Sequence, residues 1–109
     1  MITMVARMQV LPENQPAYEA LMAHVAAQVH ANEADSVLYY AWAKSVDDPD
    51  WYVVIEVYRD LAAHRAHMAS AWVQESLPVS KSLVMGKVDI KQYVTPGAEP
   101  VTHFVTDRA

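Results

Sequence analysis

The chain has 109 residues, of which 53% are hydrophobic, and its formal net charge is −5 at pH 7. That length suits one domain around a single core, and the apolar content argues against disorder. The lysines and arginines form no cluster, so the chain lacks the basic surface that nucleic acids require. No cysteine is present, which excludes disulfides, thiolate metal sites and cysteine nucleophiles and is compatible with a reducing cytoplasm. With no signal-peptide pattern and no apolar run long enough to span a membrane, we expect a cytoplasmic protein with no membrane partner.

The first half of the chain predicts a strand, a helix and a hairpin. Apolar residues at every second position from Ile2 to Val10 predict a strand with apolar side chains on much of both faces. Pro16 suits the first turn of a helix, and the residues that follow it with helical spacing are Tyr18, Leu21, Met22, Val25, Ala26 and Val29. The stretch "HANEAD" predicts the end of this helix. Two runs rich in aromatic and β-branched residues, "SVLYYAWAKS" and "WYVVIEVY", predict a hairpin from Val37 to Tyr58 around the turn "VDDPD".

The second half predicts two short helices, a last strand and a tail. Asp60 and Ser70 are good N-cap residues, so we expect one helix through Met68 and another after Ser70. Pro78 should kink or break the later helix, and Gly86 should end the helical region. The stretch "KVDIKQYV" alternates again and predicts the last strand. We assign residues 1–95 to one domain and residues 96–109 to a C-terminal tail, a candidate for packing on a partner subunit.

The order β-α-β-β-α-α-β predicts an α+β protein with a ferredoxin-like plan, in which helices cover one face of an antiparallel sheet. The expected strands, however, carry apolar residues on both sides. In the third strand Trp51, Val53, Ile55 and Val57 alternate with Tyr52, Val54, Glu56 and Tyr58. A sheet that is apolar on both faces needs two covers. We therefore expect a two-fold homodimer through the open sheet face.

Three stretches, "ITMVARMQV", "SVDDPDWYVVIEVYRD" and "AAHRAHMASAWVQ", resemble the antibiotic biosynthesis monooxygenase domain family of small dimeric α+β barrel proteins. The resemblance runs from about Ile2 to Val94. Members often show a Glu-x-Tyr or Glu-x-Trp pair that ends the third strand, then an Ala-His-x-x-Ser motif before an aromatic residue. Those positions are held here by Glu56, Tyr58, His67, Ser70 and Trp72. The chain differs from the family before the second strand, where it reads "NEADSV" in place of a small-residue turn.

The resemblance implies one of several reactions, because the family is functionally mixed and the fold does not choose between them. Some members oxidise polycyclic phenols or quinols with molecular oxygen and no metal or flavin, others degrade haem, and others isomerise phosphorylated sugars. Haem-degrading relatives tend to carry a tryptophan at the position of His67 and an asparagine at that of Arg7, and both are missing here. A sugar-phosphate isomerase needs a cationic phosphate site, for which only a few arginines and lysines are available. A non-catalytic dimeric domain that binds a small ligand is the third alternative.

His67 and Glu56 are the candidate bases. Imidazole exchanges protons near neutral pH, and His67 matches the family motif; alternatively it only packs or caps the helix junction. Glu56 stands among aromatic and aliphatic neighbours that should desolvate its carboxylate, which suits a base; alternatively it forms a structural pair with Arg7 across the sheet. His64 lies three residues before His67, but no carboxylate stands near them in the helix, and we expect no metal site. We also expect no cofactor, since the chain has no Gly-rich phosphate loop.

The leading interpretation is a cofactor-independent monooxygenase that acts on a small aromatic phenol or quinol. His67 or Glu56 would take the hydroxyl proton, Arg7 could stabilise the resulting anion, and the anion would react with oxygen itself. The aromatic residues that could hold the ring are Tyr40, Trp42, Tyr58 and Trp72, although strand aromatics are more often plain core. We expect Glu56, Tyr58 and His67 to converge on one cavity between sheet and helices. With the opposite strand parity, Glu56 and Tyr58 would instead point into the dimer interface.

Overall fold

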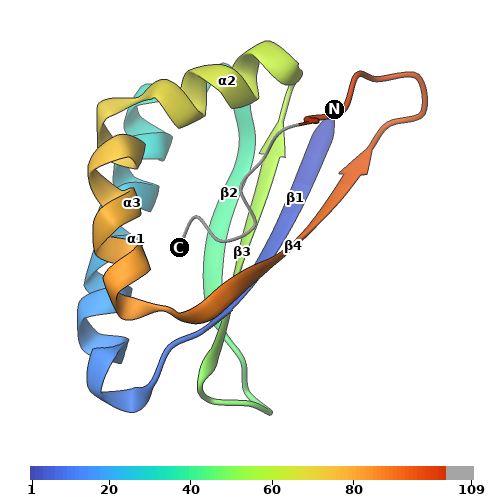
Figure 1. The fold of residues 1–109 in the computed structure, drawn as a ribbon. Helices are drawn as coiled ribbons and strands as arrows, with labels where there is room; N and C mark the ends of the chain where they lie inside the picture. Colours follow the sequence, from blue (N-terminus) through green and yellow to red (C-terminus); the bar gives the residue numbers. More distant parts are fainter. Residues whose placement is uncertain (103–109) are drawn as a thin grey trace.

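The computed structural model describes residues 1–102, and within them the chain forms four strands and three α-helices. In chain order these are β1 (Ile2–Gln9), α1 (Gln15–Asn32), β2 (Val37–Lys44), β3 (Trp51–Tyr58), α2 (Leu61–Ala69), α3 (Ala71–Leu83) and β4 (Met85–Val94), with a 3-10 turn, η1 (Pro12–Asn14), ahead of α1. The strands pair antiparallel in the spatial order β2-β3-β1-β4, with all three helices on one side (Figure 1). This is the α+β, ferredoxin-like plan predicted from the element order. No helix in the described residues is both long enough and apolar enough to cross a membrane.

The register of the two central strands decides which side chains face the helices. Ile2 of β1 pairs with Tyr58 of β3, and Met4 pairs with Glu56. Even-numbered positions of both strands are buried, whereas odd-numbered positions are half-buried or exposed. Because alternate side chains of a strand point to opposite faces, Glu56 and Tyr58 lie on the helix-covered face. Glu56 and Tyr58 thus face the helices, as predicted, and not the open face of the sheet.

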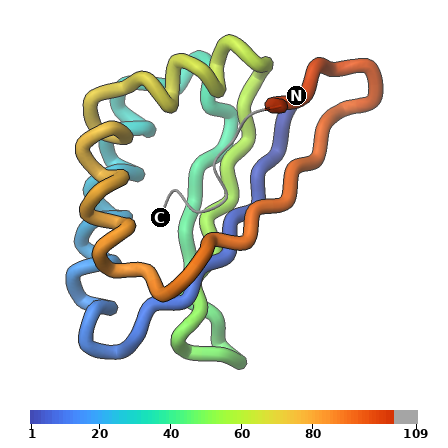
Figure 2. Tube along the Cα trace, viewed as in Figure 1, coloured from blue at the N-terminus to red at the C-terminus, as the bar shows by residue number. Residues whose placement is uncertain are grey.

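The core fills the layer between the sheet and α1, which lies beside α3 on the helix-covered side of the sheet in Figure 2. The apolar stripe predicted for this helix is the buried one: Tyr18, Met22, Val25, Ala26 and Val29 are all buried. They pack with the even-numbered residues of β1 and β3 in one continuous cluster. By contrast α3 buries only Val73 and packs chiefly against α1 and α2. The sheet and α1 therefore form the firm part of the core, and α3 lies at its edge.

The helix starts follow the prediction, and so do the ends of α1 at Asn32 and, within one residue, of α2 at Ala69, whereas the end of α3 differs. The Asp60 side chain accepts the Ala63 N–H at 2.9 Å, and the Ser70 hydroxyl accepts the Val73 N–H at 3.4 Å, so both are N-caps. Pro78, however, does not break α3, which continues to Leu83. Proline removes one intrahelical hydrogen bond, but this part of α3 is exposed, so water can reach the carbonyl left without a partner.

Gly86 also differs from the prediction, because it lies inside β4 and does not end α3. The helix ends at Leu83, and Val84 after it is already extended. Gly86 has a φ of 70°, a value that favours glycine. The β1–β4 register shifts nearby, between Arg7 and Gln9, so the glycine belongs to a strand irregularity.

Beyond β4 the chain returns to the helix-covered side of the sheet. The side-chain amide of Gln92 and the backbone of Val101 form two hydrogen bonds: Val101 N–H donates to Oε1 at 2.7 Å, and Nε2 donates to the Val101 carbonyl at 3.0 Å. Val101 is 7% exposed and joins the core cluster. The tail, residues 96–109, was expected to pack on a partner subunit, but at Val101 it packs on its own chain. Residues 103–109 of the tail lie outside the described residues.

Within residues 1–102 the opposite face of the sheet carries no helix (Figure 1), and it is largely apolar. Its half-buried residues include Val5 of β1 and three of β3, Val53, Ile55 and Val57. Two exposed tyrosines flank them on the outer strands, Tyr39 with 54% and Tyr93 with 61% of its surface exposed. This is the face on which a second cover was expected.

Candidate functional site

The site is built where four elements meet over the helix-covered face of the sheet. The end of β3 supplies Glu56 and Tyr58, the last turn of α2 supplies His67, the residue that caps the end of α1 is Glu33, and the first turn of α3 supplies Trp72. Glu56 and His67 are each 2% exposed, and Glu33 is 8% exposed. Buried ionisable groups need partners, because an unpaired buried charge costs several kcal/mol, on the order of 3–5.

His67 meets a carboxylate at each of its ring nitrogens. Its Nδ1 lies 3.0 Å from Glu33 Oε1, and its Nε2 lies 3.6 Å from Glu56 Oε1. The Tyr58 hydroxyl donates a hydrogen bond to the same Glu56 oxygen. Glu56, Tyr58 and His67 therefore contact one another. They do not all converge on one cavity as expected, because of the three only His67 lines a cavity between sheet and helices. The suggested structural pair of Glu56 with Arg7 is not formed, because those side chains lie on opposite faces of the sheet.

Glu33 is the member of this cluster that the sequence did not reveal. Its Oε2 accepts the indole N–H of Trp72 at 2.6 Å, so one carboxylate joins α1, α2 and α3. Its backbone is fixed as well: the Glu33 carbonyl accepts the Val37 N–H at 2.8 Å, and its own N–H donates to the Val29 carbonyl at 2.8 Å. One signal could have found it, since Glu33 follows Val29 by four positions and so continues the apolar stripe of the first helix.

Aromatic rings surround the imidazole. The His67 ring lies 5.3 Å from that of Tyr58 and 5.6 Å from that of Tyr40, measured between centroids. His64 is buried and meets Tyr58 edge-on at 5.0 Å. In residues 1–102 no group of three or more His, Asp or Glu side chains is arranged to hold a metal ion.

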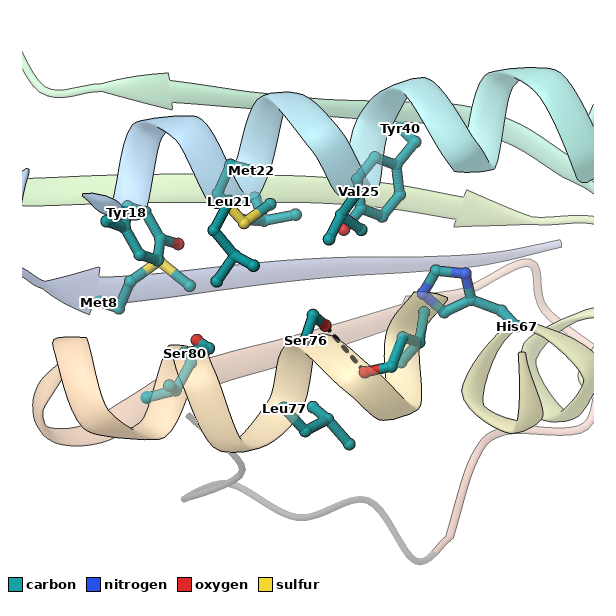
Figure 3. A pocket seen from close by; sticks show the side chains of 13 residues that line it. Met8, Tyr18, Leu21, Met22, Val25, Tyr40, His67, Ser76, Leu77 and Ser80 are labelled. Atoms are coloured by element: carbon teal, nitrogen blue, oxygen red, sulfur yellow. Dashed lines mark hydrogen bonds between the residues drawn. The ribbon is translucent and has the colours of Figure 1, made fainter. Parts of the chain in front are cut away.

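A small cavity opens beside His67, between the sheet, α1 and α3. Its volume is about 60 Å³, and most of its lining is apolar. Figure 3 shows the His67 ring at one end, with Tyr40 and Val25 near it and Ser76 and Ser80 on the wall that α3 contributes. The Ser76 hydroxyl donates to the Val73 carbonyl at 2.8 Å. The arrangement is an apolar chamber with one imidazole at its end, which can take a proton from a small bound molecule in the absence of bulk water.

The model of the antibiotic biosynthesis monooxygenase family matches residues 1–76 of the chain. The chain belongs to this family. Among solved structures it resembles a proposed antibiotic biosynthesis monooxygenase from Caulobacter crescentus, with 25% identity and a TM-score of 0.80 over 84% of this chain and 86% of that one. A proposed antibiotic biosynthesis monooxygenase from Deinococcus radiodurans shows 20% identity and a TM-score of 0.78 over 94% and 100%. The protein Rv0793 from Mycobacterium tuberculosis shows 20% identity and a TM-score of 0.77 over 94% and 96%. No curated protein matches the chain.

The candidate residues of this family member differ in whether they line the cavity. Of the candidate residues, only His67 and Tyr40 line the cavity. Glu56 and Tyr58 contact His67 without lining the cavity: the Tyr58 ring lies 5.3 Å from the imidazole, and Glu56, which accepts the Tyr58 hydroxyl, has its Oε1 3.6 Å from Nε2. Trp72 is held by Glu33 and is absent from the lining. In this monooxygenase-family chain the motif residues Glu56 and Tyr58 therefore contact the imidazole of His67 but do not line the cavity themselves.

Two candidate substrate-binding residues lie away from the cavity. Arg7 is exposed on the open sheet face, with its guanidinium carbon 5.2 Å from the centre of the Trp51 ring. Within its own chain it cannot reach an anion bound beside His67. Trp42 is on the helix-covered face, half-buried, with its ring 6.5 Å from that of Tyr52.

A second tyrosine–glutamate pair lies toward the other end of β3. The Tyr52 hydroxyl donates to Glu19 Oε2 at 2.5 Å. Burial, followed by the hydrogen bond and the negative charge of Glu19, raises the pKa of Tyr52 well above its usual range. This pair has no histidine bonded to it in the described residues, which makes it a natural comparison for Tyr58 and Glu56.

Proposed function

We propose that this protein is a cofactor-independent monooxygenase that acts on a small phenol- or quinol-type molecule. Family membership supports oxygen chemistry as the reaction class. The single observation that carries the proposal is the buried imidazole of His67 at the end of an apolar cavity, with a carboxylate at each ring nitrogen. Such a site favours removal of a hydroxyl proton, because the imidazolium that forms is stabilised by the two neighbouring carboxylates.

The chemistry needs little from the protein beyond that proton transfer. The phenol O–H bond breaks and its proton passes to Nε2 of His67. The electron-rich ring carbon of the anion then forms a bond to molecular oxygen. The O–O bond of the resulting hydroperoxide breaks, one oxygen atom stays on the ring as a quinone carbonyl, and the other leaves as water with the ring C–H proton and the proton held by His67. The substrate supplies all the electrons, and the apolar walls exclude bulk water.

The size of the cavity favours single-ring substrates over polycyclic ones. A cavity of about 150 Å³ holds one benzene molecule, and this one measures about 60 Å³. A ring can enter only if a wall moves outward. The wall with the weakest hold on the core is α3, which buries only Val73.

The same lining argues against a sugar-phosphate isomerase. Binding a phosphate requires cationic or strongly donating groups. The described residues that line the cavity include no lysine and no arginine. Arg7, the one arginine of β1, is on the other face of the sheet.

We further propose that the working unit is a homodimer through the open sheet face. The support is the apolar character of that face, where Val53, Ile55 and Val57 are only half-buried. An apolar patch of this kind on a small protein marks an interaction site. An identical sheet from a second copy would satisfy the two-fold symmetry that most such dimers have.

The test is oxygen transfer to a panel of single-ring phenols and quinols under ¹⁸O₂. We expect oxygen uptake with one ¹⁸O in the quinone product, and a loss of about 10²–10⁴-fold in kcat for His67→Ala, the usual contribution of a positioned general base. His24→Ala, which changes an exposed histidine of α1, is the matched control and should keep full activity. Tight ligand binding without oxygen uptake would instead identify a non-catalytic binding domain. Full turnover in His67→Ala would remove His67 as the base.

A further inference from the structure

The contacts of Glu33 restrict where the His67 ring carries its proton. Glu33 Oε2 accepts from the Trp72 indole, whose N–H can only donate. Glu33 Oε1 lies 3.0 Å from His67 Nδ1. An ionised carboxylate can only accept hydrogen bonds, so it pairs with Nδ1 only when that nitrogen carries a hydrogen. The other ring nitrogen, Nε2, is 3.6 Å from Glu56 Oε1, longer than a hydrogen bond.

We infer that Glu33 is a positioning residue that keeps a proton on Nδ1 of His67, so that Nε2 is the nitrogen that exchanges protons with the substrate. This holds for both charge states of the ring, because the neutral form and the imidazolium both carry hydrogen at Nδ1. The catalytic consequence rests on the proposed function, whereas the position of the proton does not. A carboxylate that fixes the tautomer of a catalytic histidine in this way is a general device of proton-transfer sites.

The surroundings of the ring agree with this assignment. Tyr58 donates to the Glu56 oxygen nearest Nε2, so that oxygen already accepts one hydrogen bond. His67 itself is 2% exposed, which leaves little access for water to replace Glu33. The rigid backbone of Glu33, which caps the end of α1, fixes the carboxylate before any substrate arrives.

Replacing one oxygen of Glu33 with nitrogen should move the proton. In Glu33→Gln the amide oxygen must face the Trp72 N–H, because that donor cannot accept. The amide NH₂ then faces His67 Nδ1 and donates to it, which requires Nδ1 to lose its hydrogen. We therefore expect the ring to change from the Nδ1–H to the Nε2–H tautomer. In the double variant Glu33→Gln with Trp72→Phe, the amide is free to turn its oxygen to His67, and the Nδ1–H tautomer should return.

The tautomer can be read without any substrate, from ¹⁵N chemical shifts and ring ¹H–¹⁵N couplings of protein labelled at histidine. The His67 signal is assigned by its loss in His67→Ala. The wild-type protein should show a protonated Nδ1, and Glu33→Gln should show a protonated Nε2. The matched control is Glu19→Gln, which alters the other carboxylate bonded to an aromatic donor and should leave His67 unchanged. A bare Nδ1 in the wild type would overturn the inference even if no variant folds, and so would an unchanged tautomer in Glu33→Gln.

Kinetics separate this inference from the proposed function. If a phenol substrate is found, Glu33→Gln should lower kcat by about 10²-fold or more with little change in KM, since the base is then wrongly protonated. A tautomer change without any oxygen transfer would support the role of Glu33 and refute the monooxygenase proposal. Oxygen transfer that Glu33→Gln leaves unaffected would do the reverse.

Discussion

Two tyrosine-to-phenylalanine changes on the same strand offer a direct measure of what burial does to a hydrogen bond. Tyr58 donates to Glu56, and Tyr52 donates to Glu19. Both tyrosines are buried, with exposed fractions of 0% and 2%. Their acceptors differ, because Glu56 is 2% exposed whereas Glu19 is half-buried. Water can therefore replace the lost hydroxyl at Glu19 but has little access to Glu56.

The expected losses follow from that difference. A hydrogen bond to a charged group contributes about 1.5–3 kcal/mol to stability, and this whole contribution is lost when water cannot replace the donor at a buried acceptor. We expect Tyr58→Phe to lower the free energy of unfolding by about 1.5–3 kcal/mol. For Tyr52→Phe, with a hydrated acceptor, we expect about 0.5–1 kcal/mol.

Urea unfolding followed by tryptophan fluorescence measures both changes. With an m-value of about 1–3 kcal/mol/M, a loss of about 2 kcal/mol lowers the midpoint by roughly 1 M while m stays constant. Both variants and the wild type must be compared at one protein concentration, because a dimer gains stability by mass action. Equal losses for the two variants, or a larger loss for Tyr52→Phe, would refute the reasoning from burial.

Three further predictions concern other parts of the molecule. Because the pKa of Tyr52 is raised, the folded chain keeps a phenolic proton that the unfolded chain releases near the ordinary pKa of about 10, so stability is intact below that pH and falls as the pH rises above it. The free energy of unfolding should therefore fall less steeply with alkaline pH in Tyr52→Phe than in the wild type, and identical slopes of stability against pH would contradict this. Ile55→Glu places a charge in the centre of the open sheet face and should convert the proposed dimer to a monomer in sedimentation velocity, while Lys81→Glu, at an exposed site of α3 on the other side of the sheet, should not. A wild-type monomer at micromolar concentration would exclude the dimer. Gly86→Ala should cost about 1–2 kcal/mol of stability through its φ of 70° alone, because no atom lies within 4 Å of the added methyl group; a neutral result in thermal unfolding would show that the strand relaxes there.

The periodic parts of the sequence were sufficient to predict the fold. The helical spacing after Pro16 and the alternation in β3 come from burial against a layer, and burial is what periodicity records. The N-caps at Asp60 and Ser70 were also predictable, because a cap is a contact between residues three apart. Pro78 and Gly86 were misjudged because their effect depends on solvent exposure and on strand register, which local sequence does not contain.

The candidate site was predictable only in part, for the same reason. His67, Glu56 and Tyr58 share a strand end and the helix that follows it, so topology brings them together once the strand parity turns Glu56 and Tyr58 toward the helices. Glu33 is 34 positions from His67 in the chain, and its role depends on the end of α1 lying close to the last turn of α2. Ser76 and Ser80 on the cavity wall belong to no motif, and their position there depends on how α3 packs against α1. The position of Arg7 on the open face follows from strand parity, because Arg7 is at an odd-numbered position of β1 and Glu56 is at an even-numbered position of β3.

The loose attachment of α3 has a consequence for how such a protein can change over generations. The groups that hold and move the proton belong to β3, to α2, to the end of α1 and to the first turn of α3, whereas much of the shape of the chamber comes from the later turns of α3. Substitutions at Leu77 or Ser80 can thus reshape the space offered to a ligand without disturbing the hydrogen bonds around His67. Selection for a new ligand and preservation of the reactive group then act on separate stretches of the chain. A scaffold divided in this way can diversify its ligands rapidly, with a single proton-handling centre inherited unchanged.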